Sequence, residues 1–257
     1  VYPEATASKW IVAEPFTGGG GSLINMAETF PKWTFHLNDL NKEISGLWKF
    51  FKTAKKSDWE NLYEKIHHQT VNLKTYQKIW EEKPISFLDR AFKVVFLNKT
   101  SYNGYITKPL PIGGWNQKSK WKVDVYWKPE NLIKKINRAK QALQDKIISV
   151  SNDDFQEFLY KTSSNFIYAD PPYIAYGRAW YGCDFDLDDL KELRRHLLWT
   201  KKWCLSIDKS EEILDIFSKD RILNIDVKYT AKSSYKSKNG QKGSIATSSE
   251  MVVFPNP

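Results

Sequence analysis

The sequence has little cysteine, no long apolar run and no regular spacing of metal-ligating residues. Its 257 residues include only Cys183 and Cys204, which suits a reducing compartment and argues against a disulfide framework or a cysteine-rich metal site. No apolar run reaches about 18 residues and no secretory signal is visible, so we expect a cytoplasmic protein with no membrane span. His36, His67 and His68 show no ligand spacing, so we expect no bound metal.

Basic and aromatic residues are abundant instead. The formal net charge is +9, and 15% of the residues are aromatic, with 11 tryptophans. A basic surface of this size favours a polyanionic partner, although a basic surface with no partner stays open at this point. The hydrophobic share of 41% is enough for one large domain, or for a core that carries an insert.

The first part of the chain predicts a βαβ unit. An apolar run, "KWIVAEPF" (Lys9–Phe16), is followed by four glycines at positions 18–21 and then by "SLINMAETF", whose apolar residues have helical spacing. The next segment, "WTFHLNDL" (Trp33–Leu40), alternates like a strand and reaches Asp39. Strand, glycine turn, helix and strand in this order are typical of α/β proteins.

The middle of the chain differs from its two ends. Residues 45–140 are rich in Lys, Trp and Tyr and have mostly helical periodicity, interrupted by the Gly/Pro-rich segment Ile106–Lys122, for which we expect a loop. We expect Trp48, Trp59 and Trp80 in a helical core. From residue 141 onward, α/β alternation returns and ends in a strand, a Gly/Lys-rich loop and a strand. The sequence therefore predicts a mostly parallel α/β sheet, formed by residues 1–44 and 141–257 and split by a basic helical insert, residues 45–140.

The glycine turn and Asp39 together favour a nucleoside site. Glycines between a strand and a helix let a ligand approach the backbone and the helix N-terminal N–H groups. Asp39 follows the next strand, where a doubly wound fold places a carboxylate on a ribose diol. The "GGGGS" segment lacks the spaced glycine fingerprint of dinucleotide sites. A turn without a ligand is the alternative reading of the glycines alone.

A second candidate site follows the apolar run that ends at Ala169. Asp170, Pro171, Pro172 and Tyr173 stand where open α/β sheets bind ligands, outside the carboxyl ends of strands. The prolines remove two N–H donors and leave carbonyl acceptors beside the Asp170 carboxylate. Such a group of acceptors suits a substrate amino group with two hydrogens, and Tyr173 offers a flat face to a planar ring. A nucleobase in a duplex would first have to be flipped out.

These motifs, in their order, resemble the Dam-like (D12 class, alpha group) adenine-specific DNA methyltransferases. The resemblance rests on "EPFTGGGGS", Asp39, "DDFQEF" (Asp153–Phe158) and "YADPPY". Further similar segments are "FLNKTSYNGYITK" (Phe96–Lys108), "GRAWYG" (Gly177–Gly182) and "SEMVVFP" near the C-terminus. The family implies a Rossmann-like S-adenosylmethionine-dependent methyltransferase sheet with a helical target-recognition insert.

The resemblance also implies residue roles. S-adenosylmethionine would be the methyl donor, S-adenosylhomocysteine the product, and no metal would be needed. Asp170 and the Pro171 carbonyl would bind the target amine, with Pro172 completing the rigid turn and Tyr173 stacked on the flipped adenine. The residues expected to hold the donor are Glu14, Phe16, Thr17, Gly18, Asp39, Asp154, Phe155 and Asp170.

Double-stranded DNA is the partner that the resemblance implies. The residues expected to contact it are Asn98, Tyr102, Asn103, Lys108, Lys118, Lys120, Lys236 and Lys238. Trp115 and Trp121 are candidate DNA-facing aromatics, with a packing role equally open. At the position where the family usually has Arg this chain has Thr107, with Lys108 beside it, and Lys makes a weaker bidentate phosphate contact. The family usually has an N-terminal donor-binding motif with Lys and paired glycines before the first strand, and this motif is not in the present sequence.

Three alternatives follow from the same residues. The acceptor turn would also suit a cytosine amine or an RNA base, although Asp at position 170 favours adenine by family habit. A non-catalytic nucleic-acid-binding protein on a methyltransferase fold is the alternative from another class, and the intact acceptor turn argues against it. We expect a monomer or weak dimer, acting on DNA in a bacterial, archaeal or phage-infected cell, and a cognate restriction endonuclease is a candidate partner.

Overall fold

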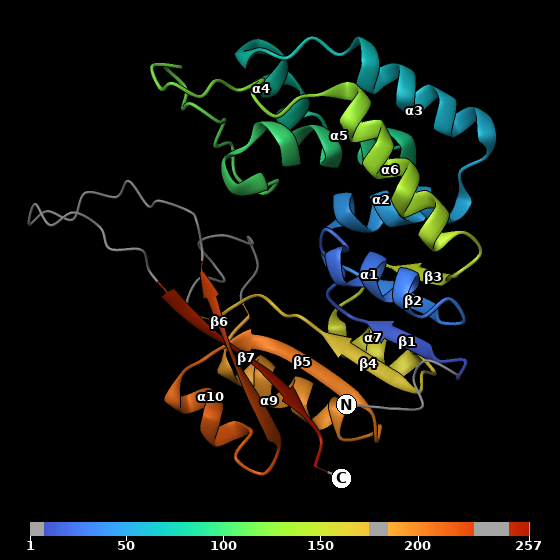
Figure 1. Cartoon of the computed structure of the whole chain (residues 1–257), viewed down its shortest axis with the longest axis vertical. Coiled ribbons are helices and arrows are strands. Elements are labelled where there is room, and N and C mark those ends of the chain that lie inside the picture. The colour runs from blue at the N-terminus through green and yellow to red at the C-terminus, as the bar shows by residue number, and fades with distance from the viewer. Residues whose placement is uncertain (1–7, 175–184, 229–246, 257) are drawn as a thin grey trace, which may run out of the picture. The chain divides into compact units, whose positions relative to one another are not determined.

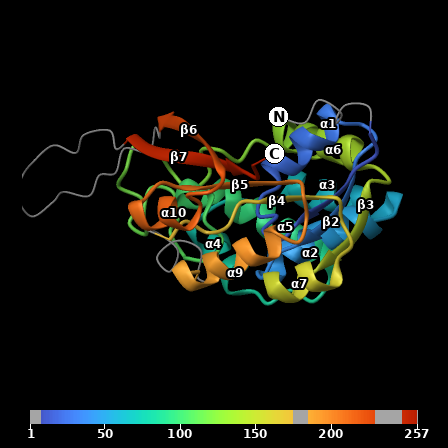
Figure 2. The same cartoon turned by 90° about the horizontal axis from the view of Figure 1, so that it is seen from below.

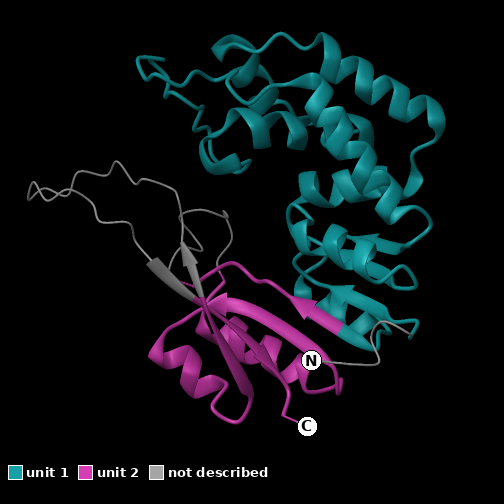
Figure 3. Ribbon diagram, viewed as in Figure 1, with its two compact units in different colours: residues 1–166 teal, residues 167–257 magenta. Residues whose placement is uncertain are grey.

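The structure is a computed structural model that describes residues 8–174, 185–228 and 247–256. Figures 1 and 2 show its helices and strands in two views, and Figure 3 shows two compact units, residues 1–166 and 167–257. The chain passes from the first unit into the second within strand β4 (Phe166–Ala169).

The first unit begins with the predicted βαβ arrangement. Its strands are β1 (Ile11–Glu14), β2 (Thr34–Asn38) and β3 (Ile147–Ser151), in the order β3-β2-β1 with parallel pairing. Helix α1 (Gly21–Thr29) joins β1 to β2, and α7 (Phe155–Lys161) follows β3. Because the three strands are parallel, their last residues lie at the same edge of this part of the sheet; these residues are Glu14, Asn38 and Ser151. Val12, Ala13, Phe35 and Leu37 are fully buried.

The insert between β2 and β3 is helical, as predicted. Its elements are α2 (Lys42–Thr53), α3 (Lys56–His68), α4 (Leu73–Glu81), α5 (Phe87–Thr100), the 3₁₀ turn η2 (Tyr102–Gly104) and α6 (Pro129–Leu143). Side-chain caps start several of them: Asn41 accepts from the Glu43 backbone N–H at 2.9 Å, and Ser86 accepts from Asp89 at 3.1 Å. Pro129 starts α6, where a missing N–H costs no helical bond.

Aromatic residues form the core of the insert. The Trp59 ring packs on Phe50 and Phe51 at centroid distances of 4.8 and 5.0 Å, and Trp127 packs on Phe96 at 5.2 Å. The prediction that Trp48 and Trp59 are core residues is confirmed, since both are buried, whereas Trp80 is half-buried. His67 and His68 lie on the exposed face of α3.

The second unit completes the α/β alternation. Its elements are β4, α9 (Leu187–Leu197), β5 (Trp203–Asp208), α10 (Glu211–Ile216), β6 (Arg221–Lys228) and β7 (Thr247–Phe254). Its strand order is β4-β5-β7-β6; β4 and β5 are parallel, and β7 is antiparallel to both of its neighbours. Trp203, Leu205 and Ile207 alternate inward along β5 and are fully buried, and α9 and α10 lie together on one face of the strands (Figure 2).

The α/β fold class with a helical insert is therefore confirmed. The division into a catalytic domain, residues 1–44 and 141–257, and a recognition insert, residues 45–140, is a division by function and stays a prediction. Across the described ranges, no helix is long and apolar enough to span a membrane. In the same ranges, no three His, Cys, Asp or Glu side chains are grouped as a metal would need.

Candidate active site

The glycine turn after β1 is held open by its own backbone geometry. Gly18 and Gly20 have φ angles of +50° and +69°, a region that favours glycine. The Trp48 indole of α2 lies directly against this turn: its Nε1 donates to the Gly18 carbonyl at 3.0 Å, and a Cβ on Gly20 would come 2.2 Å from its ring. Gly20 is the N-cap of α1 and, having no side chain, supplies no side-chain cap to the helix.

Asp39 is fixed beside this turn. Its Oδ2 accepts from the Gly18 N–H and its Oδ1 from the Asn41 N–H, both at 2.8 Å. Burial raises the pKa of Asp39 to about 6, against the lowering effect of the Asn41 and Gly18 bonds. The Asn152 side-chain amide donates to the Asp39 carbonyl at 2.8 Å, so the segment after β3 is joined to the segment after β2. Each carboxylate oxygen keeps acceptor capacity for a further hydroxyl.

Asn38 joins three segments under the site, and sequence analysis did not single it out. Its Nδ2 donates to the Pro15 and Asp153 carbonyls, both at 3.0 Å. Its Oδ1 accepts from the Ser151 hydroxyl at 2.9 Å and from the Asp153 N–H at 3.0 Å. The residue is 1% exposed. A buried amide with four bonds fixes the ends of β1, β2 and β3 relative to one another.

Phe16 and Phe155, predicted to lie near the donor, are brought together. Their ring centroids are 5.5 Å apart, with Phe155 buried and Phe16 half-buried. Asp154 is the exposed N-cap of α7, and its Oδ1 accepts from the Gln156 N–H at 2.8 Å. Its second oxygen can therefore accept from a ligand amine while the first caps the helix.

Two more predicted donor residues, Glu14 and Thr17, lie at the same edge, whereas Asp170 belongs to the second unit. Glu14 is 1% exposed at the end of β1. The Thr17 hydroxyl donates to the Asn38 carbonyl at 3.0 Å, and its N–H donates to the same carbonyl at 2.9 Å. Thus Glu14, Phe16, Thr17, Gly18, Asp39, Asp154 and Phe155 all occur at the carboxyl edge of β1, β2 and β3. A glycine backbone, a fixed carboxylate and two aromatic rings are the kinds of group that suit S-adenosylmethionine, which consists of an amino acid, a ribose and an adenine.

The acceptor turn lies in the second unit. Asp170 directly follows β4 and retains access to solvent, while Pro171 is buried and Pro172 and Tyr173 are half-buried. Neither proline has an N–H, so the Pro171 carbonyl and the Asp170 carboxylate face no donor from the turn itself.

Asp170 titrates well above an ordinary aspartate. Partial burial raises its pKa to about 6; the negative charge of Glu250 adds to this, and a hydrogen bond from Ser206 opposes it. Glu250 lies opposite Asp208 in the β5–β7 pairing. Burial and the charge of Asp170 also raise the pKa of the Cys204 thiol to about 12, so this thiol stays protonated.

Three predicted DNA contacts lie at the end of α5 and in the turn that follows it. Ser101 pairs with Pro111, and the Tyr102 N–H donates to the Leu110 carbonyl at 2.7 Å. Tyr102 and Asn103 are exposed, and Asn103 has a φ of +51°, a conformation that Asn tolerates. Asn98 is exposed near the end of α5.

The Gly/Pro-rich loop is compact. The Gln117 Nε2 donates to the Gly114 carbonyl at 2.7 Å, and its Oε1 accepts from the Val123 N–H at 2.9 Å. Lys118 and Lys120 are exposed on this loop, and Lys108 is half-exposed before it.

Trp115 and Trp121 are both exposed, at 47% and 53%. Trp115 also packs against Tyr76 at a centroid distance of 5.9 Å, whereas Trp121 lines a pocket. Lys236, Lys238, Cys183 and the segment 177–182 lie outside the described residues.

A glycine turn with a fixed acidic partner and an Asp-Pro-Pro-Tyr turn after a parallel strand are both typical of α/β methyltransferases that act on amino groups. Residues 3–231 match the family described as D12 class N6 adenine-specific DNA methyltransferase, and the chain belongs to this family. It is 24% identical over 246 residues to the Type II methyltransferase M.CviBI of Paramecium bursaria Chlorella virus NC1A, covering 93% of this chain and 87% of that protein.

Membership confirms the predicted family, fold class and enzyme class. The family methylates the N6 position of adenine in DNA, so DNA is the substrate class, and S-adenosylmethionine is the general donor of such enzymes.

Proposed function

We propose that the chain transfers a methyl group to the exocyclic N6 amino group of an adenine flipped out of double-stranded DNA. The observation that carries the proposal is the acceptor turn, where Asp170 and a proline carbonyl stand together at the end of a parallel strand without N–H donors. The family match supports the choice of adenine over a cytosine amine.

Donor binding is assigned to the first unit. Glu14, Phe16, Thr17 and Gly18 would line the methionine end, and Asp39 would accept from the ribose hydroxyls. Asp154 would accept from the donor's adenine amine, with Phe155 packed on the ring. When bound, S-adenosylmethionine supplies a methyl group made electrophilic by its sulfonium. Catalysis requires that this donor site and the acceptor turn face the same amine.

Asp170 has the central chemical role. The adenine amine is a poor nucleophile because its lone pair is delocalised into the ring. The Asp170 carboxylate and the Pro171 carbonyl accept its two hydrogens and so favour a tetrahedral, nucleophilic nitrogen. Tyr173 stacks on the extruded base, and Pro172 keeps the turn rigid. A proton leaves the amine after transfer, and the solvent access of Asp170 gives it a path to water.

The context of the activity is part of the proposal. The Type II relative supports a role in marking DNA against a cognate endonuclease. We propose that the enzyme acts as a monomer or weak dimer on the DNA of the cell that contains it, in the cytoplasm of a bacterial, archaeal or phage-infected host. The net charge of +9 supports direct association with duplex DNA.

Asp170→Ala tests the mechanism. We expect methyl transfer to fall by at least about a thousandfold while the donor still binds, because the substitution removes an acceptor needed in the transition state. Mass analysis of nucleosides from treated DNA and RNA measures transfer, and calorimetry with S-adenosylmethionine measures donor binding. Asp188→Ala, at an exposed position of α9, is the matched control and should behave like the wild type.

The outcomes separate the alternatives. An active Asp170→Ala enzyme overturns the mechanism. N4-methylcytosine as the product, or methylation of RNA alone, would move the substrate to one of the other amines. A wild-type chain, with its native start, that gives no heat with S-adenosylmethionine would instead be a binding module.

A further inference from the structure

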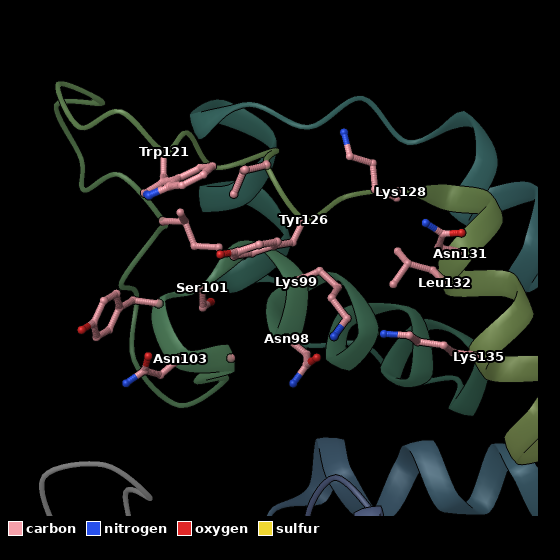
Figure 4. Close-up of a pocket in the computed structure, with 14 residues that line it drawn as sticks. Asn98, Lys99, Ser101, Asn103, Trp121, Tyr126, Lys128, Asn131, Leu132 and Lys135 are labelled. Atoms are coloured by element: carbon pink, nitrogen blue, oxygen red, sulfur yellow. The ribbon is translucent and has the colours of Figure 1, made fainter. Parts of the chain in front are cut away.

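A pocket of about 720 Å³ lies in the insert, away from the proposed donor site (Figure 4). It is lined by the end of α5, the η2 turn, the loop Trp121–Lys128 and the start of α6, and all of these belong to the first unit. We call it the α5–α6 pocket. Its volume falls in the range of sites that hold a nucleotide-sized ligand.

The charge of the α5–α6 pocket is of one sign. Lys99, Lys128 and Lys135 line it, and no Asp or Glu is among its described lining residues. Lys99 extends from α5 and Lys135 from α6, and in Figure 4 their amino groups point toward one another. The positive charge of Lys135 adds to the effect of burial in lowering the pKa of Lys99.

This lysine pair has no counter-ion in the described part of the chain, where no residue forms a hydrogen bond or ion pair with the amino group of Lys99 or Lys135. Two other cations of α6 do have partners. Arg138 donates two hydrogen bonds to the Glu28 carboxylate, and the Lys140 amino group lies 4.8 Å from the centroid of the Trp59 ring. Two like charges held close together are unfavourable unless an anion lies between them.

The opposite wall of the pocket is aromatic and exposed. Trp121 and Tyr126 are 53% and 58% exposed, although each is large and apolar. Tyr126 is held in place because its neighbour Trp127 is buried on Phe96 and the Val125 N–H donates to the Lys122 carbonyl at 3.1 Å. Fixed, exposed rings beside lysines are the arrangement on which nucleobases stack while their phosphates are neutralised.

We propose that the α5–α6 pocket binds one nucleotide unit of the DNA strand, with its phosphate between Lys99 and Lys135 and its base against Tyr126. The inference rests on the proposed function, because it takes DNA as the ligand. Asn98, Tyr102 and Asn103, expected from sequence to contact DNA, line the same pocket, so the pocket unites them with side chains that sequence analysis did not find.

The test compares Lys99→Ala, Lys135→Ala and the double variant with Lys134→Ala. Lys134 is exposed on α6 next to Lys135 but does not line the pocket, which makes it a matched control. The affinity for a fluorescent duplex oligonucleotide is measured by anisotropy over a series of salt concentrations. We expect each pocket variant to bind about tenfold more weakly at low salt, with a log–log salt slope shallower by about 0.9 for each phosphate that is no longer neutralised.

Lys134→Ala should stay within about twofold of the wild type, with an unchanged slope. Tyr126→Ala should weaken binding of the duplex by about tenfold, and Tyr126→Phe should restore it, because stacking needs the ring and not the hydroxyl. In all variants we expect the affinity for S-adenosylmethionine to stay the same and the KM for DNA to rise with little change in kcat.

Two failures are distinguishable. If the wild type methylates DNA but the pocket variants keep its affinity and salt slope, the pocket assignment is overturned and the proposed function stands. If the wild type binds the donor and methylates no DNA, the proposed function itself fails. Should Lys99→Ala disturb folding in a thermal melt, Lys135→Ala decides alone, since that side chain is exposed.

Discussion

At the scale of single residues, two aspartates carry the proposed chemistry and both titrate near pH 6. The physical causes differ. Burial raises the pKa of Asp39, although the hydrogen bonds from two backbone N–H groups lower it. The same two bonds hold the carboxylate in position. Partial burial and the nearby negative charge of Glu250 raise the pKa of Asp170. Each carboxyl group accepts hydrogen bonds more strongly when it is ionised, so acid should impair donor binding at one and methyl transfer at the other.

The donor affinity is expected to fall below about pH 6 because of Asp39. Above its pKa the carboxylate accepts from the ribose hydroxyls, and below it the affinity should fall up to about tenfold per pH unit. Calorimetric titration with S-adenosylmethionine between about pH 5 and 8 measures this. Asp39→Asn should bind weakly at neutral pH and show little of this pH dependence. Asp170→Asn is the control and should keep the acid loss of affinity; if Asp39→Asn keeps it too, another group is responsible.

At the scale of elements, the strand ends and the turns that leave them position the site. Periodicity was sufficient to predict several of these elements: residues 45–140, which contain α5, are helical, and the segments around β1 and β2 and the apolar run that ends at Ala169 are strands. The acceptor turn and Asp39 stood out because Pro, Gly and Asp have local conformational signatures.

The remaining elements of the site could not be read from the sequence for a physical reason. Helix α7 has seven residues, too few for a helical period to show. Asn38 ties β2 to segments more than 100 positions away, and Trp48 donates to Gly18 across 30 positions. Such bonds depend on how the sheet and insert pack, and nothing in a local window of sequence encodes them. The lysine pair of Lys99 and Lys135 is hidden in the same way, because it joins two helices.

The glycine turn gives a prediction about stability. Gly20→Ala would place a side chain at φ +69° with its Cβ 2.2 Å from the Trp48 ring. We expect a loss of about 3 kcal/mol in the free energy of unfolding, from backbone strain and displacement of the indole, together with weaker donor binding.

Gly21→Ala is the matched control, since no positive φ and no atom within 4 Å stand in its way. This variant should be neutral or up to about 1 kcal/mol more stable, because Ala favours the first turn of α1 and restricts the unfolded chain. Urea denaturation of both variants measures the difference. Equal stabilities would show that the indole does not constrain the turn.

At the scale of the whole molecule, the net charge of +9 is either a DNA-binding feature or a solvated surface with no partner. Five lysines were predicted to contact DNA, namely Lys108, Lys118, Lys120, Lys236 and Lys238. If they act together, the affinity for duplex DNA should fall with salt along a log–log slope of about −4 or steeper, since each neutralised phosphate contributes about −0.9. Binding of S-adenosylmethionine should change little over the same salt range, because no phosphate is involved.

Anisotropy with a duplex, in parallel with donor calorimetry at each salt concentration, separates the two readings. A steep slope for DNA beside a flat one for the donor would place the charge in the DNA interface, and a nearly flat DNA slope would assign most lysines to the solvated surface. The salt slope also measures how many of the phosphate contacts come from the insert. The double variant Lys118→Ala and Lys120→Ala should have a slope that is shallower by about 1.8 if both lysines contact phosphates. Lys56→Ala, at an exposed position of α3 outside the predicted DNA contacts, should leave it unchanged.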